Sequence, residues 1–278
     1  YGFIGPNGAG KSTTIRMIMS IIFPDSGDLK VLGRASAVES KDRIGYLPEE
    51  RGVYRKMKVG AFLNYMGRLK GVDAAACDAR VKQWLDRMSL AENYRKKCEE
   101  LSKGMQQKVQ FIAAVLHEPE LLILDEPFSG LDPVNSRLLR ELIDEQHDAG
   151  RTVIFSTHQM FQAEQICDRI VMIHQGIKRL DATPQEIAAK YAHRTLLAEP
   201  IDRGHALGVI ESMPGVARVD DGGAVLEVEL NDGLDPSAAL AAIAAAGPMR
   251  RIELRRTSLE DVFIEIVEDS RAFEMSDF

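Results

Sequence analysis

The chain has 278 residues, of which 45% are hydrophobic, so it can form one large or two modest domains with hydrophobic cores. No run approaches the roughly 18 apolar residues of a membrane span, and the first residues carry no basic and then apolar leader. The net charge of −7 is concentrated in residues 191–278, which hold 8 Lys and Arg against 17 Asp and Glu. Such an acidic surface repels phosphate backbones and disfavours a nucleic-acid partner.

Strands and helices alternate along residues 1–190. A glycine-rich loop at 5–12 leads into a helix over Thr13–Met19, and Asp28–Leu32 and Ile44–Leu47 are predicted short strands. Further strands are predicted at 121–124, 152–156 and 170–174, and further helices at 60–88 (as two helices), 101–116, 134–148 and 159–167. The alternation predicts an α/β fold with a mostly parallel sheet. The helical block at about 55–116 interrupts it and is predicted to be an inserted subdomain.

The pattern changes after about residue 190. Strands are predicted at 195–198, 216–219, 224–230 and 250–255, with helices at 203–212 and 236–246 and a last helix that begins near Ser258. The order β-α-β-β-α-β predicts a small ferredoxin-like α+β domain over residues 191–278.

The spacing GxxxxGK[ST] of a phosphate-binding loop is met at Gly5, Gly10, Lys11 and Ser12. Glycines let the backbone N–H groups turn inward around a phosphate, and the helix that follows adds its N-terminal dipole. Lys11 is predicted to bind the β- and γ-phosphates, and Ser12 is a candidate Mg²⁺ ligand. The predicted ATP-binding residues are Gly5, Pro6, Asn7, Gly8, Ala9, Gly10, Lys11, Ser12 and Thr13.

Acidic and histidine side chains follow two of the buried strands. Asp125 and Glu126 end the apolar run 121–124, at the strand end where ligands bind in such sheets. Asp125 is a predicted Mg²⁺ ligand, and Glu126 is placed to deprotonate the attacking water. His158 follows the next strand and can donate to a phosphate. An acidic pair or a lone histidine at a strand end is by itself more often a helix cap or a structural residue, but the phosphate loop favours the catalytic interpretation.

These segments resemble the nucleotide-binding subunit of ATP-binding cassette (ABC) transporters. The stretch Leu101–Lys108 resembles the signature sequence of that family, Ser129–Asp132 matches its D-loop, and His158 matches its switch histidine. The resemblance implies that Ser102, Gly104 and Asp132 act on nucleotide in a dimer, with the signature of one chain contacting the ATP held by the other. It therefore implies a homodimer, or a heterodimer with a similar ATPase, around two ATP molecules.

Three departures from the family pattern refine the prediction. Lys103 and Met105 replace a glycine and a glutamine of the signature, and Glu49 stands at the glutamine position of the Q-loop. A carboxylate there can accept a proton or bind Mg²⁺ but cannot donate, so Glu49 is both a catalytic and a metal-ligand candidate. The segment that starts at Glu49 resembles the ABC-2 type exporters for sodium and drugs, in which residues 49–70 would dock onto a polytopic membrane permease. The alternative, that Glu49 and Glu50 are ordinary solvated acids, stays open.

The family also has about two strands before the phosphate loop, which carry an aromatic side chain for adenine. Here Tyr1 lies only four residues before Gly5, so the adenine contact is predicted to be missing or to lie on other residues. The predicted function is ATP hydrolysis that powers export, on the cytoplasmic face of the cell membrane. The alternative is a soluble ABC-type ATPase acting on nucleic acid or ribosomes. The acidic C-terminal domain is predicted to dimerise or dock rather than to sense a ligand.

Overall fold

The computed structural model describes residues 1–35, 37–50, 52–191, 195–231, 234–245, 247–255 and 257–276. The chain forms two compact units, Tyr1–Pro184 and Gln185–Phe278. Arg51, within the segment that resembles the exporters, and Ala246, at the end of a predicted helix, lie outside the described residues.

A six-stranded sheet organises the first unit. Its strands are β1 (Gly2–Ile4), β2 (Ile44–Leu47), β3 (Leu121–Asp125), β4 (Thr152–Thr157), β5 (Ile170–His174) and β6 (Ile177–Ala182). They lie in the order β2-β3-β4-β1-β5-β6, with only the β5–β6 pair antiparallel among these neighbours. All five residues of β3 are buried, as expected for a central strand covered on both faces.

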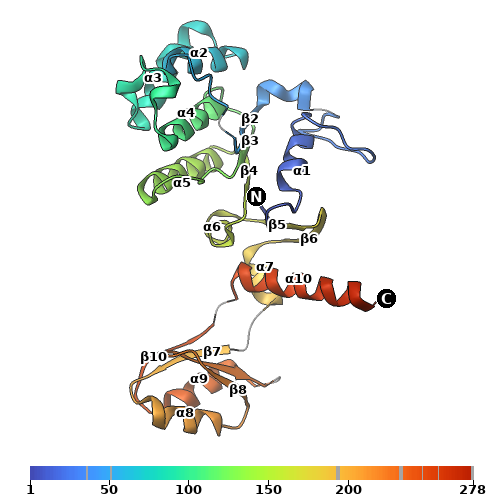
Figure 1. Cartoon of the computed structure of the whole chain (residues 1–278), viewed down its shortest axis with the longest axis vertical. Helices are drawn as coiled ribbons and strands as arrows, with labels where there is room; N and C mark the ends of the chain where they lie inside the picture. The colour runs from blue at the N-terminus through green and yellow to red at the C-terminus, as the bar shows by residue number, and fades with distance from the viewer. Residues whose placement is uncertain are drawn as a thin grey trace. The chain divides into compact units, whose positions relative to one another are not determined.

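Helices cover both faces of this sheet. Figure 1 shows α1 (Lys11–Ile18) on one face and α5 (Pro133–Asp148) and α6 (Met160–Ile166) on the other. On the α1 side, Ile15 packs with Ile44, Leu121 and Ile123 in one buried cluster. Since parallel strands all point the same way, the loops after β1, β3 and β4 meet at one edge of the sheet.

Three helices form the inserted helical subdomain. They are α2 (Val59–Leu69), α3 (Ala74–Arg87) and α4 (Lys103–Val115), which lie together beyond the β2 edge of the sheet (Figure 1). Short 3₁₀ helices lie at Ala91–Asn93 and Cys98–Glu100, and a further one at Ala37–Arg43 precedes β2. Asp78 on α3 joins them, because it accepts hydrogen bonds from Asn64 of α2 at 3.0 Å and from the hydroxyl of Tyr94. Hydrogen bonds from Lys82, then Tyr94 and Asn64, hold the pKa of the Asp78 carboxyl at about 2.

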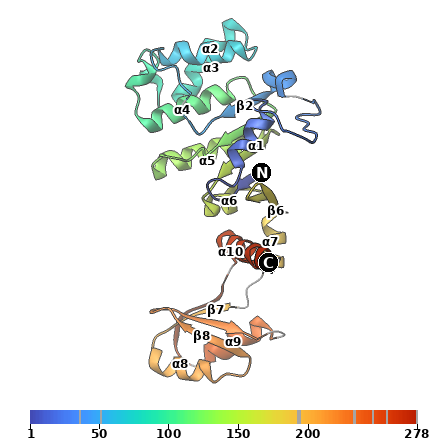
Figure 2. The same cartoon turned by 45° about the vertical axis from the view of Figure 1, so that its right-hand side comes forward.

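The second unit contains the predicted ferredoxin-like fold. Its elements are β7 (Thr195–Pro200), α8 (Arg203–Glu211), β8 (Val216–Asp221), β9 (Leu226–Leu230), α9 (Pro236–Ala245) and β10 (Met249–Leu254), preceded by α7 (Pro184–Lys190) and followed by α10 (Leu259–Ser276). The antiparallel sheet has the order β10-β7-β9-β8, and α8 and α9 lie together on one of its faces (Figure 2). Leu196, Val228, Ile210 and Ile243 form the centre of its buried cluster.

The predicted strand at Asp28–Leu32 is wrong. Val31 and Arg34 exchange both backbone hydrogen bonds, at 2.8 and 3.0 Å, across a turn whose central residues Leu32 and Gly33 have φ of 50° and 77°. These positive φ values reverse the chain within four residues, so no strand extends there. The strand β6 and the helix α7 were not predicted; β6 pairs with β5 across the tight turn at Gln175 and Gly176.

The helical subdomain depends on a close approach at Gly60. A Cβ atom there would lie 2.4 Å from two ring carbons of Tyr94. We predict that Gly60→Ala lowers the free energy of unfolding of the first unit by about 1–3 kcal/mol, because the ring must move. Gly208 of α8 has no atom within 4 Å of such a Cβ, so Gly208→Ala should stabilise the second unit by roughly 0.5–1 kcal/mol. Thermal unfolding measures both, and an equal response of the two variants would contradict the packing argument.

Candidate active site

The phosphate loop connects β1 to α1. Gly10 is the residue before α1 and has φ of 105°, and Gly8 has φ of 80°, conformations that favour glycine. A Cβ at Gly5 would lie 2.2 Å from the carbonyl oxygen of Ile173 in β5. The loop is closed by a hydrogen bond from the N–H of Gly176 to the carbonyl of Ala9, 2.9 Å long. The glycines thus let the loop lie against β5 with its backbone folded around the start of α1.

Lys11 is buried at the centre of this loop. Its side chain is 7% exposed, and Nζ donates to the carbonyls of Gly5 at 2.7 Å and Pro6 at 3.1 Å. Burial lowers the pKa of Lys11, and the charges of Glu126, Asp125 and Glu49 oppose that shift. Three carboxylates from the ends of β2 and β3 therefore act on this one ammonium group.

Asp125 and Ser156 meet across the β3–β4 ladder. The two residues are directly paired in the register of the parallel strands, and both are buried. The hydroxyl of Ser156 donates to Oδ1 of Asp125 and also lies 3.3 Å from the backbone N of Glu126, which donates to it. The hydroxyl thus positions the carboxylate of Asp125, while the backbone N–H of Glu126 also donates to the carbonyl of Ser156, 3.1 Å away.

Glu126 is held in an unusual backbone conformation. Its φ is 48°, which costs a residue with a Cβ about 1–2 kcal/mol. The backbone N–H of His158 donates to Glu126 Oε1 at 2.9 Å, and His158 Nδ1 lies 2.7 Å from the same oxygen. Thr157 donates a longer hydrogen bond to Oε2, at 3.4 Å. The side chain of Glu126 is 9% exposed and that of His158 is 46% exposed, so the pair joins a buried carboxylate to a partly exposed ring.

The signature-like segment begins α4. Ser102 caps the helix as predicted, accepting a hydrogen bond from the backbone N–H of Met105 at 3.3 Å. Its side chain is exposed, and within the described part of the chain its hydrogen bonds are to its own helix. Asp132 caps α5 by accepting from the N–H of Asn135 at 3.0 Å, which lowers the pKa of Asp132.

Glu49 lies two residues beyond β2 and is exposed. It acts on Lys11 through its charge, and no direct bond between the two side chains is present in the described residues. Burial raises the pKa of the neighbouring Tyr46 hydroxyl, and the charge of Asp125 adds to that shift. The structure thus gathers Lys11, Asp125, Glu126, His158 and Glu49 at one edge of the sheet.

The donor set fits a magnesium ion bound together with phosphates. Mg²⁺ takes few protein oxygens and completes its shell with water and substrate phosphate. Ser12, at the second position of α1, and Asp125, at the end of β3, offer a hydroxyl and a carboxylate. Among the residues the structure describes, no three His, Cys, Asp or Glu side chains form a cluster that could hold a metal by themselves, as expected for a site that shares its ligands with a nucleotide.

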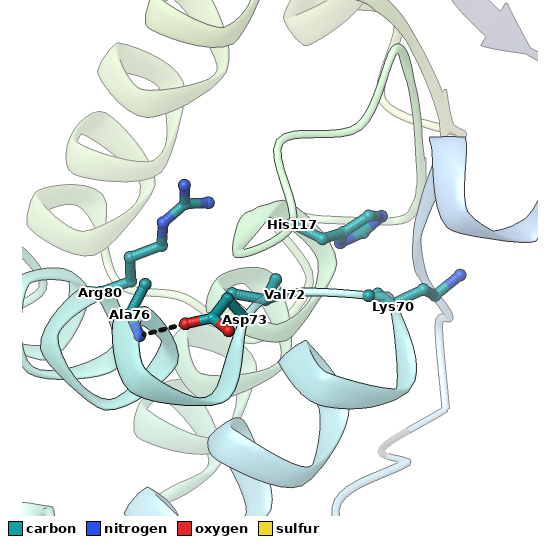
Figure 3. A pocket seen from close by; sticks show the side chains of 7 residues that line it. Lys70, Val72, Asp73, Ala76, Arg80 and His117 are labelled. Atoms are coloured by element: carbon teal, nitrogen blue, oxygen red, sulfur yellow. Dashed lines mark hydrogen bonds between the residues drawn. The ribbon is translucent and has the colours of Figure 1, made fainter.

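Ser156 and Thr157 were not predicted as site residues. The available signal was their place at the end of the strand that precedes His158, because parallel strands bring their ends to one edge. A separate cavity of about 200 Å³ lies in the helical subdomain between α2, α3 and His117 (Figure 3). Figure 3 shows Lys70 and Arg80 on opposite sides of it with Asp73 between them, and none of the predicted site residues lines it.

Comparison with known proteins identifies the family. The sequence model of the family described as "ABC transporter" matches residues 1–129, and that of the "ATP-binding protein DrrA1-3-like, C-terminal domain" matches residues 183–267. A model described as "AAA domain, putative AbiEii toxin, Type IV TA system" matches residues 98–161.

Curated relatives and solved structures agree with the first of these families. An uncharacterized ABC transporter ATP-binding protein of Alkalihalophilus pseudofirmus is 40% identical over 95% of this chain and 98% of its own length. The ABC transporter ATP-binding protein NatA of Bacillus subtilis is 37% identical over 63% of this chain and 73% of its own. A solved ATP-binding subunit of an ABC transporter superposes with a TM-score of 0.64, at 32% identity over 68% of this chain and 80% of that one.

The fold and these relatives define a P-loop ATPase of the ABC class. The chain belongs to the ATP-binding proteins of ABC transporters, and it hydrolyses ATP. The predicted fold, family and C-terminal accessory domain are thereby confirmed. Within the described residues, no helix is both long and apolar enough to cross a bilayer.

The hydroxyl of Ser156 provides a test of the site geometry. We predict that Ser156→Ala lowers the free energy of unfolding by about 1–3 kcal/mol, because it leaves the buried carboxylate of Asp125 short of a hydrogen-bond donor. ATP turnover should fall with it. Ser40 is equally buried, but its hydroxyl has no partner within the described residues, so Ser40→Ala should be neutral or slightly stabilising. Denaturant unfolding and ATPase rates check both, and equal losses in the two variants would count against the role of Ser156.

Proposed function

We propose that this chain powers export by an ABC transporter, through ATP-driven association of two copies and coupling to a separate membrane permease. The observation that carries the proposal is the pair of Glu126 and His158 beside Lys11, together with an exposed Ser102 on the same chain. The first group is a complete hydrolytic set for one phosphate chain. Ser102, whose hydrogen bonds in the described structure stay within its own helix, is free to contact a nucleotide held by a partner.

The residues have distinct roles in this proposal. The loop Gly5–Thr13 binds the phosphates through its backbone N–H groups, and Lys11 exchanges its two carbonyl partners for phosphate oxygens. Ser12 and Asp125 would hold Mg²⁺, with Glu49 nearby. When bound, the ion would neutralise negative charge on the phosphate oxygens. Glu126 takes a proton from the attacking water through Oε2, since Oε1 lies close to both the backbone N–H and the ring of His158, whereas Oε2 accepts only the long 3.4 Å bond from Thr157.

His158 has two competing tasks. If Nδ1 carries a proton that it donates to Glu126, a neutral ring has only an acceptor left at Nε2. In a neutral ring, donation to Glu126 through Nδ1 and donation to a γ-phosphate through Nε2 therefore exclude each other.

An aromatic surface on the helical subdomain fits the predicted permease contact. Tyr54, Tyr65 and Leu69 are 52%, 44% and 62% exposed, and the ring of Tyr54 packs edge-on against Phe62 at 5.8 Å and Tyr65 at 6.0 Å. Exposed aromatic clusters of this kind are typical of protein interfaces. The solved cbiO1 of Clostridium perfringens, described as part of the ABC transporter complex cbiONQ, superposes with a TM-score of 0.59 at 25% identity over 68% of this chain and 78% of that one. We predict that the wild type co-purifies with a polytopic membrane protein and that the Tyr65→Glu variant does not.

The remaining assignments follow from this partner. The ATPase domain would span residues 1–190, and the acidic domain 191–278 would dock or dimerise. The chain would then lie on the cytoplasmic face of the membrane. A role on nucleic acid or ribosomes is the weaker candidate, because the C-terminal domain carries an excess of carboxylates.

Glu126→Gln tests the hydrolytic assignment. The amide keeps the size of the side chain but cannot take the proton from water, so turnover should fall by roughly 100-fold or more. ATP should still bind, and because it is not consumed, a dimer should accumulate. ATPase rates and size-exclusion chromatography with Mg²⁺ and ATP measure the two effects. Undiminished turnover would remove Glu126 as the base, and a monomer with bound ATP would remove the proposed dimer.

A further inference from the structure

Helix α4 carries two buried carboxamides that reach other parts of the active site. Gln107 and Gln110 are each 5% exposed and lie three residues apart, on one side of the helix. Nε2 of Gln107 donates to the carbonyl of Pro127 at 3.2 Å, and Nε2 of Gln110 donates to the carbonyl of Glu50 at 3.3 Å. The first acceptor directly follows Glu126, and the second directly follows Glu49.

The turn after β3 also approaches the start of α4. A Cβ built on Gly104 would lie 3.5 Å from Cδ2 of Leu131, so the two segments are close there. The same turn is closed internally by hydrogen bonds from Ser129 to Glu126 and from Leu131 to Phe128, of 3.1 and 3.2 Å. The turn 126–132 and the first turns of α4 thus lie close together at Leu131 and Gly104 and are joined by the Gln107 hydrogen bond.

We propose that Gln107 is a positioning residue that couples the two ATP sites of the dimer. The inference rests on the proposed function, in which Ser102 and Gly104 contact the nucleotide of the partner chain. α4 is a continuous hydrogen-bonded helix, so a shift at Ser102 moves Gln107 with it. Gln107 passes that shift to Pro127 and hence to Glu126, and ATP bound by the partner thereby sets the geometry of this chain's own base.

The backbone at Glu126 explains why such a link matters. Its positive φ is strained, and strained conformations persist only where neighbouring contacts hold them. Pro127 has no N–H, so its carbonyl is the one backbone hydrogen-bonding group of this residue. The bond from Gln107 is therefore a direct restraint on the turn that carries Glu126. When α4 withdraws, that restraint weakens and the carboxylate loses its productive position.

The test replaces the carboxamide by an apolar side chain of similar length. In Gln107→Met, we expect kcat to fall at least fivefold and the Hill coefficient for ATP to drop to about 1, while the Kd for ATP and the KM change less than twofold. Gln107→Glu keeps a polar side chain of the same size without a donor at neutral pH, and should show the same kinetics. The Gln107→Glu variant therefore allows the same kinetic measurement if the Gln107→Met variant folds poorly.

Gln146 of α5 provides the matched control. It is 4% exposed, and its carboxamide oxygen accepts from Arg151, away from the predicted site residues. Gln146→Met should lower the melting temperature without changing the Hill coefficient. If the Gln107 variants behave like Gln146→Met, with cooperativity intact, the positioning role is wrong.

The wild type separates this inference from the proposed function. A wild-type chain that does not dimerise with ATP overturns the proposed function. A wild type that dimerises and hydrolyses ATP with a Hill coefficient of about 1 leaves the proposed function standing and overturns the coupling. Cooperative hydrolysis in the wild type that disappears in both Gln107 variants supports the inference.

Discussion

The active site depends on the pairing of β3 with β4. The register that sets Asp125 opposite Ser156 puts a buried hydroxyl between two acidic residues. A slip of one residue in that pairing would turn Ser156 to the other face of the sheet and leave the carboxylate of Asp125 without its hydroxyl partner. The phosphate loop, His158 and Asp125 lie at the same edge of the parallel sheet.

The pairing of β3 with β4 also places Glu126, which directly follows β3. Its side chain is fixed by the backbone and ring of His158, and its backbone is held in the left-handed region by the turn that follows β3. That turn is in contact with α4, and α4 begins at the exposed Ser102. In the proposed dimer, Ser102 would face the partner chain and is thereby linked, through one helix and one turn, to the proposed base of this chain's own site.

Most of the site could be predicted from the sequence because its signals are local. The loop Gly5–Ser12 and the apolar strand before Asp125 are recognisable from spacing alone, and Ser102 is recognisable as a helix cap. Gln107 and Ser156 were missed because their roles depend on contacts between segments 20 and 31 residues apart. The strand predicted at Asp28–Leu32 was wrong for a related reason. Its pattern suited a strand, but positive φ values at Leu32 and Gly33 turn the chain back.

The shared site is tested most directly by mixing two inactive variants. Lys11→Ala abolishes the phosphate grip of its own site, and Ser102→Arg obstructs the site of the partner. Each variant alone should be inactive, whereas a mixed dimer keeps one site with both Lys11 and Ser102 intact. In a mixture of equal amounts about half of the dimers are mixed, and each mixed dimer has one intact site of two. The account therefore predicts that mixing restores up to about a quarter of the wild-type ATPase rate. A mixture that forms mixed dimers with ATP and stays as inactive as its components would contradict it.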